Sequence, residues 1–457
     1  MAEDSNYQAK GYTIKQFNLY MSDEYKPSET IAEIAPEDGN PIDIRGICPG
    51  FKYIESLTSP SVRMELAIAD TMDLISDLTG NEFIQIELES DSAPDQPLTI
   101  RQRIFKIGSV TKSERMQAYV IYTVSPEAYN NETNRVFKSF KNKTGVDHVK
   151  EVVEKFLKSA GREYSYEAST GNFNFISPSW RPFDVIAYIS DKIVSSETKK
   201  AGYMFFENKN GFYFNTIDTL TKGELMNEEG NIPQFTYEQA NVGDSEFNAY
   251  NIESMNYPDQ GNHLEKMRTG AYVNTVIGVK APALTSGNLP TAGSGSDGPS
   301  GSIKKPVTQT LLQVFSEAET LNDAFPFPKI KEEYFDEKKP TRTKIRALPG
   351  MKNATTALDG SASAGSMDTD TVAASAYSYS RWQLLNSITL DITVPGNVSL
   401  TVGMVIECKI PASKNEEDRT VLDPIYSGRY LITGLYHDYN PEGLTTRLHL
   451  SKDSVTS

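Results

Sequence analysis

The sequence predicts a mainly β fold with smaller α+β accessory parts, and three observations lead to it. Apolar and polar residues alternate with a period of two along much of 11–125, and again along 382–450. This period places successive side chains on opposite sides of a strand. Tyr (24) and Phe (20) are also plentiful in a chain that is 38% hydrophobic. Because aromatic residues favour pleated sheets, the chain is expected to be globular and rich in strands.

The C-terminal region has the clearest pattern. Gly, Pro and Asn residues separate its alternating segments, as in the turn Pro395-Gly396-Asn397. Strands with one apolar face, joined by such turns, predict an antiparallel meander or small barrel. The four predicted strands are 388–394, 404–410, 430–436 and 444–450.

Residues 11–125 predict a second β domain. A short helix is expected after its third strand, from the N-cap Asp70 to Gly80, because Asp accepts hydrogen bonds at helix starts and Gly ends helices. The predicted strands are 14–20, 42–47, 62–68, 84–88, 98–107 and 116–124.

Residues 126–232 change to an α+β pattern. One helix is expected around 149–157, with Asp147 as its cap and Gly161 after its end. Pro182 suits the first turn of a second helix, and a hairpin follows over 202–214. The apolar stripes of the two helices are Val149, Val152, Val153, Phe156 and Leu157 in the first, and Phe183, Ile186, Ile189 and Ile193 in the second.

The remaining chain reads as a β domain that carries an insertion. Residues 286–302 and 354–375 are rich in Gly, Ser and Ala, a composition that cannot bury a core. Helices are expected at Thr308–Leu321 and Ala373–Leu385. The predicted domains are a first β-barrel domain at 1–126, an α+β domain at 127–232, a second β-barrel domain at 233–280 and 377–457, and the insertion at 281–376.

Length and composition set outer bounds. A chain of 457 residues is expected to hold two to four domains. The net charge of −16 argues against a protein that grips nucleic acid, because phosphate binding needs Lys and Arg. Cys48 and Cys408 are expected to be buried free thiols. Neither a membrane-spanning run nor an apolar signal core occurs, so we expect a protein made in the cytoplasm that is not exported by a signal peptide.

The sequence offers no catalytic, cofactor-binding or metal-binding residues, and it does not identify binding residues. Its histidines, His148, His263, His437 and His449, lack metal-ligand spacing, and His437 and His449 are expected on strands. No nucleophile elbow or phosphate loop occurs. Asp368-Thr369-Asp370 is interpreted as a chance match to a cation loop and Glu416-Glu417-Asp418 as a solvated loop. The aromatic group Phe205, Phe206, Phe212, Tyr213 and Phe214 is interpreted as hairpin core, so an enzyme is not expected.

Two stretches resemble a known family. Residues 62–88, two strands around a short helix, are similar to the first tube domain of the baseplate central hub protein of contractile-tailed bacteriophages. Residues 386–451 are similar to its second tube domain, through the turn at Pro395, the pair Gly403-Met404 and the segment 427–432. The helix start at Ser179-Trp180-Arg181-Pro182-Phe183 is also similar. Late-control tail proteins and type VI secretion spike hubs share this layout.

The resemblance implies two related small β-barrel tube domains per chain, the second interrupted by the insertion. It implies a homotrimer that closes into a pseudo-sixfold ring, a structural adapter between the hexameric tail tube and the trimeric central spike. The implied partners are the chain itself, the spike, tail tube and tape-measure proteins, and neighbouring baseplate wedge proteins. The location would be the virion, in the tail baseplate, after assembly in the host cytoplasm. No membrane and no sequence-specific nucleic acid are implied.

Other functions stay open at this point. Acidic residues facing the lumen would let DNA pass without sticking. A polysaccharide-binding or glycoside-hydrolysing tail protein would need paired carboxylates in a cleft. The chain also fits a hub component of a contractile secretion machine, or a β-rich binding module in such a machine. No spike or lysozyme domain is expected after the second barrel, which separates the chain from a full type VI spike protein.

Overall fold

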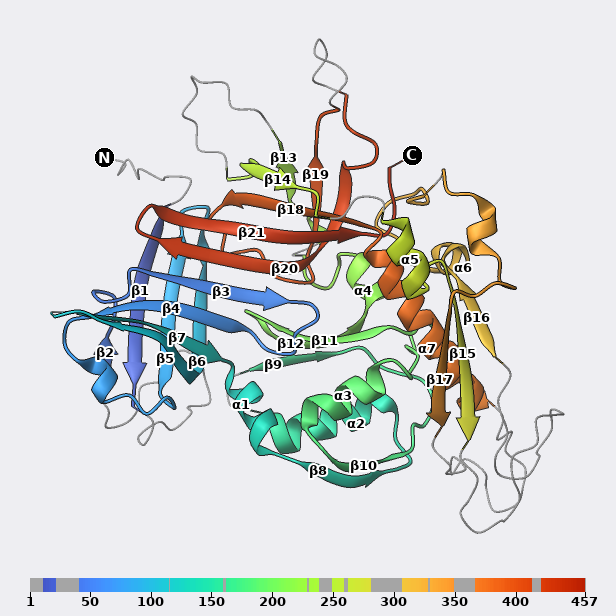
Figure 1. Ribbon diagram of the computed structural model, residues 1–457, viewed down its shortest axis with the longest axis horizontal. Coiled ribbons are helices and arrows are strands. Elements are labelled where there is room, and N and C mark those ends of the chain that lie inside the picture. The colour runs from blue at the N-terminus through green and yellow to red at the C-terminus, as the bar shows by residue number, and fades with distance from the viewer. Residues whose placement is uncertain are drawn as a thin grey trace.

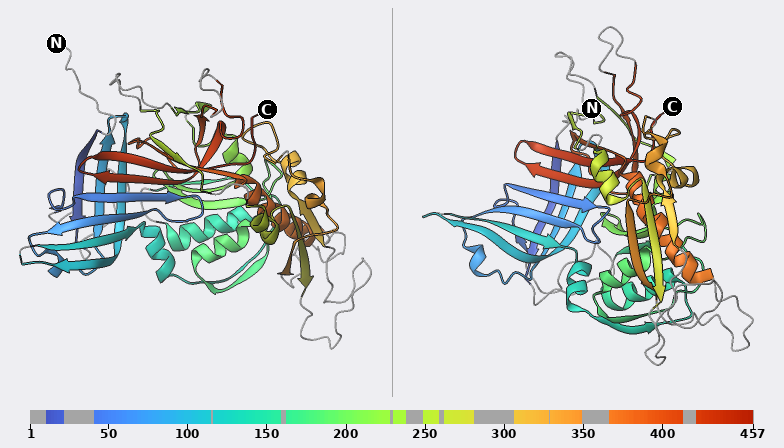
Figure 2. Two further views of the ribbon diagram at one scale, coloured as in Figure 1. Left: turned by 45° about the horizontal axis from the view of Figure 1, so that its top comes forward. Right: turned by 45° about the vertical axis from the view of Figure 1, so that its right-hand side comes forward.

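A computed structural model gives the fold and confirms a mainly β protein (Figure 1). It describes residues 11–21, 41–114, 116–158, 162–227, 230–237, 249–258, 262–280, 306–327, 329–348, 366–412 and 421–456. Figures 1 and 2 show an elongated body with β-sheet on one side. An α+β unit lies below the sheet, and a helix-backed small sheet lies at the other end.

The N-terminal β unit is an antiparallel sheet in the order β3-β4-β7-β6-β5-β1-β2. Only Ile42–Asp43 of the predicted strand 42–47 forms a strand, because the chain turns at Ile44, whose N–H donates to the Phe17 carbonyl. The strands of the unit are β1 Tyr12–Tyr20, β2 Ile42–Asp43, β3 Gly50–Ser56, β4 Arg63–Asp70, β5 Phe83–Ser90, β6 Ala93–Lys112 and β7 Gln117–Val124.

The predicted short helix in this unit is a single 3-10 turn, Leu74–Ser76. The carboxylate of Asp70 nevertheless accepts hydrogen bonds from the N–H groups of Met72 and Ile75, at 2.9 and 3.0 Å. Gly80 has a φ of 83°, which suits glycine at the end of a turn. The sequence therefore located the turn but overestimated its length. The predicted N-cap Asp70 is wrong, because Asp73 precedes the turn directly, although Asp70 still binds the N–H groups around it.

The C-terminal β unit contains the four predicted strands in antiparallel pairs, but not as a simple meander. β21 lies between β18 and β20, and β19 pairs with the other edge of β20. A period-two pattern specifies which face of a strand is buried, not which strand lies beside it. The strands are β18 Ile388–Pro395, β19 Val405–Lys409, β20 Gly428–Asn440 and β21 Gly443–Lys452, joined by β13 Gln234–Thr236 on β19 and β14 Ser254–Asn256 on β18.

The two β units form one continuous sheet. β20 pairs with β21 along one edge, and its second half pairs with β3, from Gly434 opposite Ser56 to Tyr439 opposite Phe51. Thirteen strands are thereby joined, and a single hydrophobic core runs beneath both units. In the part of the chain that the structure describes, no ladder returns from β1 or β2 to β3, so the N-terminal strands do not close a barrel.

The α+β unit follows the predicted order. Its second predicted helix begins at Pro182, as expected, and the aromatic hairpin packs Phe206 and Phe214 in the interior. The predicted cap Asp147 is wrong: Thr144 is the N-cap, and its hydroxyl accepts the N–H of Asp147 at 3.2 Å. Gly161 lies outside the described residues. The elements are α1 Pro126–Thr133, β8 Val136–Phe140, α2 Gly145–Val152, a π-helical turn Val153–Leu157, β9 Glu163–Tyr166, β10 Phe175–Trp180, α3 Pro182–Ser190, β11 Tyr203–Asn208, β12 Gly211–Thr216 and α4 Ile217–Thr221.

A small three-stranded sheet, backed by a long helix, occupies the other end of the body (Figure 1). The predicted helix Thr308–Leu321 is shorter, because 307–310 pair with β15 as a strand and the hydroxyl of Thr310 caps the helix that follows. The predicted soft stretch ends earlier than 375, since the long helix begins at 366. The elements are α5 His263–Thr269, β15 Val273–Lys280, β16 Val307–Thr310, α6 Leu311–Glu317, a 3-10 turn Glu332–Phe335, β17 Arg342–Leu348 and α7 Ser366–Leu385.

Strand pairing bears on the predicted insertion without fixing its limits. β13 and β14 lie beside the C-terminal strands, whereas β15 lies in the small sheet with β16 and β17. The Gly/Ser-rich segment 286–302 lies outside the described residues. The domain limits stay a prediction.

Both cysteines are buried free thiols, as predicted. Burial raises the pKa of Cys48 and of Cys408 to about 12, far from the range in which a thiolate forms at neutral pH.

Neither thiol is therefore expected to react with a thiol-specific disulfide reagent in the native protein at pH 8. Two equivalents should react in denaturant. Rapid labelling of the native protein would contradict the burial of these side chains.

Candidate functional site

The solvent-facing side of the continuous sheet is the most extended surface that both β units share. We call it the long face. Directly opposed residues form two rows across six strands, from β18 or β21 to β7 or β6. One row is Thr393, Arg447, Tyr436, Ile54, Arg63 and Val124, and the other is Thr445, Asp438, Lys52, Glu65, Tyr122 and Lys106.

These two rows of the long face are not acidic. The two rows hold four cations and two carboxylates, although the whole chain has a net charge of −16. Asp438 pairs with Arg447 and lies 3.9 Å from Lys52, so one carboxylate serves two cations. Next to these rows, His449 of β21 lies opposite Asp391 of β18, with 2.5 Å between its Nδ1 and the carboxylate. The acidic balance of the chain therefore lies elsewhere than on these rows.

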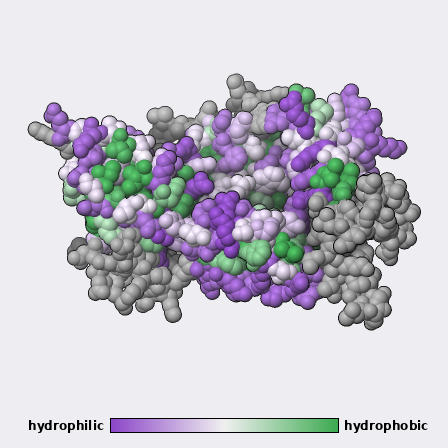
Figure 3. Space-filling model, turned by 60° about the horizontal axis from the view of Figure 1, so that its bottom comes forward, coloured by the Kyte–Doolittle hydropathy of each residue, from purple (hydrophilic) through white to green (hydrophobic). Residues whose placement is uncertain are grey.

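The hairpin of β6 and β7 projects from the body beside the long face (Figure 2). It exposes three large apolar side chains, with Phe105 46%, Val110 53% and Met116 42% accessible. Figure 3 shows hydrophobic surface gathered over the N-terminal β unit. Exposed apolar groups on a projecting hairpin are typical of a contact with another protein.

Behind the long face, a buried carboxylate joins three parts of the chain. Glu55 of β3 is 1% exposed and accepts four hydrogen bonds. Its partners are the Tyr53 hydroxyl at 2.7 Å, the Lys209 N–H at 2.7 Å, the Thr401 hydroxyl at 2.8 Å and the Val402 N–H at 2.8 Å. Burial raises the pKa of Glu55, while these four bonds act in the opposite direction. The Glu55 cluster therefore ties the N-terminal β unit to the β11–β12 turn and to the C-terminal unit.

A second buried carboxylate lies on the neighbouring hairpin. Glu207 of β11 pairs with Arg162 and accepts the N–H of Val62 at 2.9 Å. Arg162 also lies 3.9 Å from Glu127 of α1. Burial raises the pKa of Glu207, and the Glu127 charge adds to this, although Arg162 opposes both. The pair fixes the α+β unit against the start of β4.

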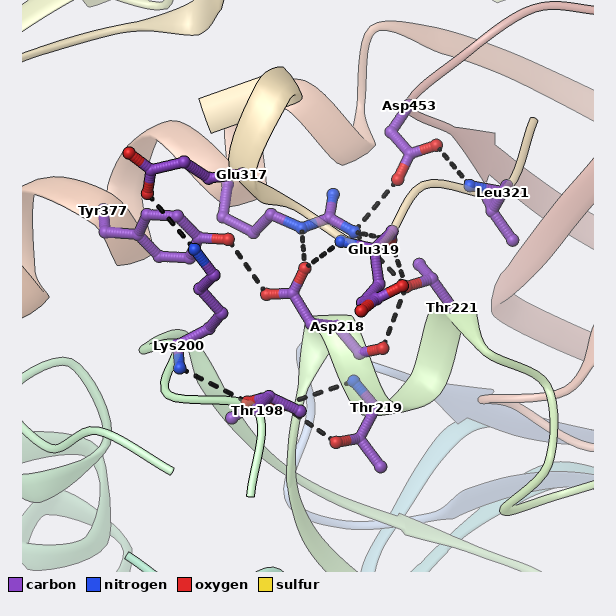
Figure 4. A network of polar contacts seen from close by, with 12 residues as sticks. Thr198, Lys200, Asp218, Thr219, Thr221, Glu317, Glu319, Leu321, Tyr377 and Asp453 are labelled. Atoms are coloured by element: carbon purple, nitrogen blue, oxygen red, sulfur yellow. Dashed lines mark hydrogen bonds and ion pairs between the residues drawn. The ribbon is translucent and has the colours of Figure 1, made fainter. Parts of the chain in front are cut away.

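A third buried ionic group lies where α4, α7 and the C-terminal end of the chain meet (Figure 4). Arg381 of α7 is inaccessible to solvent and pairs with Asp218 at 3.0 Å and with Asp453 at 2.9 Å. Its guanidinium also donates to the Glu319 carbonyl at 3.0 Å. Asp218 in turn accepts from the Tyr377 hydroxyl at 3.1 Å. This Arg381 network links the α+β unit, the helix before β18 and the end of β21.

The histidines and acidic stretches singled out from the sequence do not come together. His437 lies on β20 and His449 on β21, as predicted; burial lowers the pKa of His437 to about 3. Within the described residues, no three His, Cys, Asp or Glu side chains are placed to hold a metal ion. Asp368-Thr369-Asp370 lies in α7, and Glu416-Glu417-Asp418 lies outside the described residues. No described helix is long and apolar enough to cross a membrane.

Sequence reasoning missed the buried ionic residues. Glu55 had a signal, because a period of two from Phe51 and Tyr53 places it on the buried face of β3. A carboxylate at such a position needs partners. Arg381 had none, since its two aspartates lie 163 and 72 residues away in the sequence.

Solved structures of two tail proteins have a fold similar to that of this chain. No family model matches the chain, and no curated protein matches its sequence. The tail protein from Neisseria meningitidis MC58 superposes with a TM-score of 0.52 at 10% identity, covering 97% of each chain. The 43 kDa tail protein of prophage MuSo2 from Shewanella oneidensis gives 0.52 at 11% identity, over 97% of this chain and 100% of that one. The resemblance drawn from strands and turns is thus confirmed at the level of the fold: this chain has the fold of phage tail proteins.

Proposed function

We propose that this chain is a structural protein of a phage tail and forms the central hub of a contractile-tail baseplate in the virion. Its fold, shared with two tail proteins over nearly the whole chain, supports this proposal. The observation that carries it is the ladder between β20 and β3, which makes the N-terminal and C-terminal β units neighbours in one sheet. A rigid pair of β units is the building block that a ring of such units needs.

In the proposed assembly each β unit is the counterpart of one tube domain. Three copies of the chain contribute six units and close a pseudo-sixfold ring, because closed rings satisfy surfaces that a single copy leaves exposed. One side of the ring then meets the sixfold tail tube, and the other meets the threefold central spike. The tape-measure protein and wedge proteins are the further proposed neighbours.

The projecting hairpin is the proposed contact between one copy and its neighbours. Changing both Phe105 and Val110 to Ser should weaken self-association at least tenfold while leaving the fold intact, since both side chains are half exposed in the single chain. Met72 is 62% exposed on the same unit, and Met72→Ser is the matched control. Sedimentation velocity over a concentration series measures the effect. Equal association of the double variant and the control would remove the hairpin from the interface.

Electron microscopy of the purified assembly tests the proposed symmetry. Class averages viewed down the axis should show six similar densities around a channel, with alternate densities differing. Averages without threefold symmetry, in a sample of defined mass, would contradict the adapter role.

A further inference from the structure

A cavity lies between the α+β unit and the helix-backed small sheet, away from the long face. Its volume is about 520 Å³, within the usual range of small-molecule sites, which often lie between domains. One wall comes from the loops around α3, including Phe173, Ile193 and Ala201, and the other from α7, including Ala374 and Tyr377. We call it the lysine cavity.

Three lysines and one carboxylate line this cavity. Lys200 is balanced by Glu317 of α6 at 3.2 Å, as Figure 4 shows beside Tyr377. Lys199 is exposed, and its ammonium donates to the Ser196 carbonyl at 2.6 Å, with no carboxylate partner among the described residues. The lining therefore carries an excess of positive charge.

Lys192 is the buried member of this group, at 8% exposed. Its ammonium donates to the Tyr188 carbonyl at 2.5 Å and to Asp191 at 2.7 Å. Asp191 also pairs with Arg346 of β17, so its charge is shared. Lys344, two residues away on the same strand, adds a cation that makes no ion pair with any described residue.

Burial, together with the nearby positive charge of Lys344, lowers the pKa of Lys192 to about 7. The folded protein thus binds this proton less tightly than the unfolded chain, and stability falls as the pH drops from about 10 towards 7. A buried cation without a full counter-charge is costly, and such groups in cavities often mark ligand sites. An anion beside Lys192 would remove the cost.

We propose that the lysine cavity binds a small organic anion whose carboxylate or phosphate oxygens are held by Lys192 and Lys199 while its apolar part lies against the wall formed by α7. Occupancy would tie α7 to the α+β unit. This proposal does not depend on the ring, and a monomer would bind the anion equally well.

Calorimetric titration of the full chain tests the proposal, with inorganic phosphate and with glutarate as separate probes at pH 7.5. Chloride keeps the ionic strength equal, and two buffers of different ionisation enthalpy report proton uptake. At least one probe should bind with a Kd below about 1 mM. Glutarate, which does not titrate at this pH, should bind with partial proton uptake, since an adjacent anion raises the pKa of Lys192. The tighter probe identifies the head group.

Variants locate the site. Lys192→Met should weaken binding at least tenfold and abolish the proton uptake, and Lys199→Met should weaken binding with no change in Tm. Lys222→Met, at the exposed end of α4, is the control and should bind as the wild type does. Failure of both probes to saturate at 10-fold above that Kd, or unchanged binding by Lys199→Met, would overturn the proposal even if Lys192→Met does not fold.

Discussion

Replacing Arg381 with Met is expected to destabilise the protein by about 3–5 kcal/mol, because it leaves two buried carboxylates without their cation. Asp218 and Asp453 are both inaccessible to solvent and both face this guanidinium. Removing one partner of a buried pair costs more than replacing the whole group with neutral side chains. The variant should loosen first where α4, α7 and the end of β21 meet, since the network joins these three elements.

Urea unfolding followed by Trp382 fluorescence measures this effect, in a Trp180→Phe background that leaves one Trp beside the substituted residue. Arg447→Met, on the long face where the Arg447 side chain is 52% exposed, should change stability by less than about 1 kcal/mol. Adding Asp218→Asn and Asp453→Asn to Arg381→Met should recover part of the loss. If the single variant unfolds at the same urea concentration as the Arg447 control, the network does not hold these elements together.

Glu55→Ala is expected to cost at least about 3 kcal/mol, since three buried donors and one part-buried donor lose their acceptor at once, and each unsatisfied buried donor costs roughly 1–3 kcal/mol. Two of these donors are backbone N–H groups, of Lys209 and Val402, in parts of the chain far from β3. Their amide hydrogens should therefore exchange faster in the variant. Glu55→Gln keeps one acceptor oxygen and should show a smaller effect.

Hydrogen exchange separates this role from a general loss of stability. Glu65→Ala, on the solvent-facing side of β4, is the control and should leave both amides protected. Selective loss of protection at the β11–β12 turn and around Val402 supports the Glu55 cluster as the joint between three units. If amide exchange instead became uniformly faster along β3 and β4 while the amides of Lys209 and Val402 stayed protected, the carboxylate would not make this joint.

Much of the fold could be predicted from the sequence because strand faces are local information. The alternation along 388–394 and 444–450 identifies two strands with one buried face each. It cannot say that β18 and β21 are neighbours, since Leu390 would pack equally well beside another apolar strand. The pairing of Leu390 with Leu450 is a long-range result. For the same reason, nothing in β20 indicated that its second half would continue the sheet into β3.

The candidate site was harder to predict, because it depends on which residues face each other across strands. The net charge alone, for example, did not indicate that Arg63, Lys52 and Arg447 would lie on the long face. Glu55 could have been found as a carboxylate among the apolar residues on the buried face of a strand. Arg381 could not, because its helix lies beside α4 and the end of β21 only in the folded chain.

The mass of the purified protein in solution tests the proposed hub most directly, measured alone and mixed with a candidate central spike protein. The account predicts three copies per particle in at least one of these conditions. A trimer would place six β units in one assembly and justify a search for the two kinds of contact between them. A chain that stays monomeric with every tail partner would contradict the ring, and binding of cell-surface polysaccharides would then be the function to test.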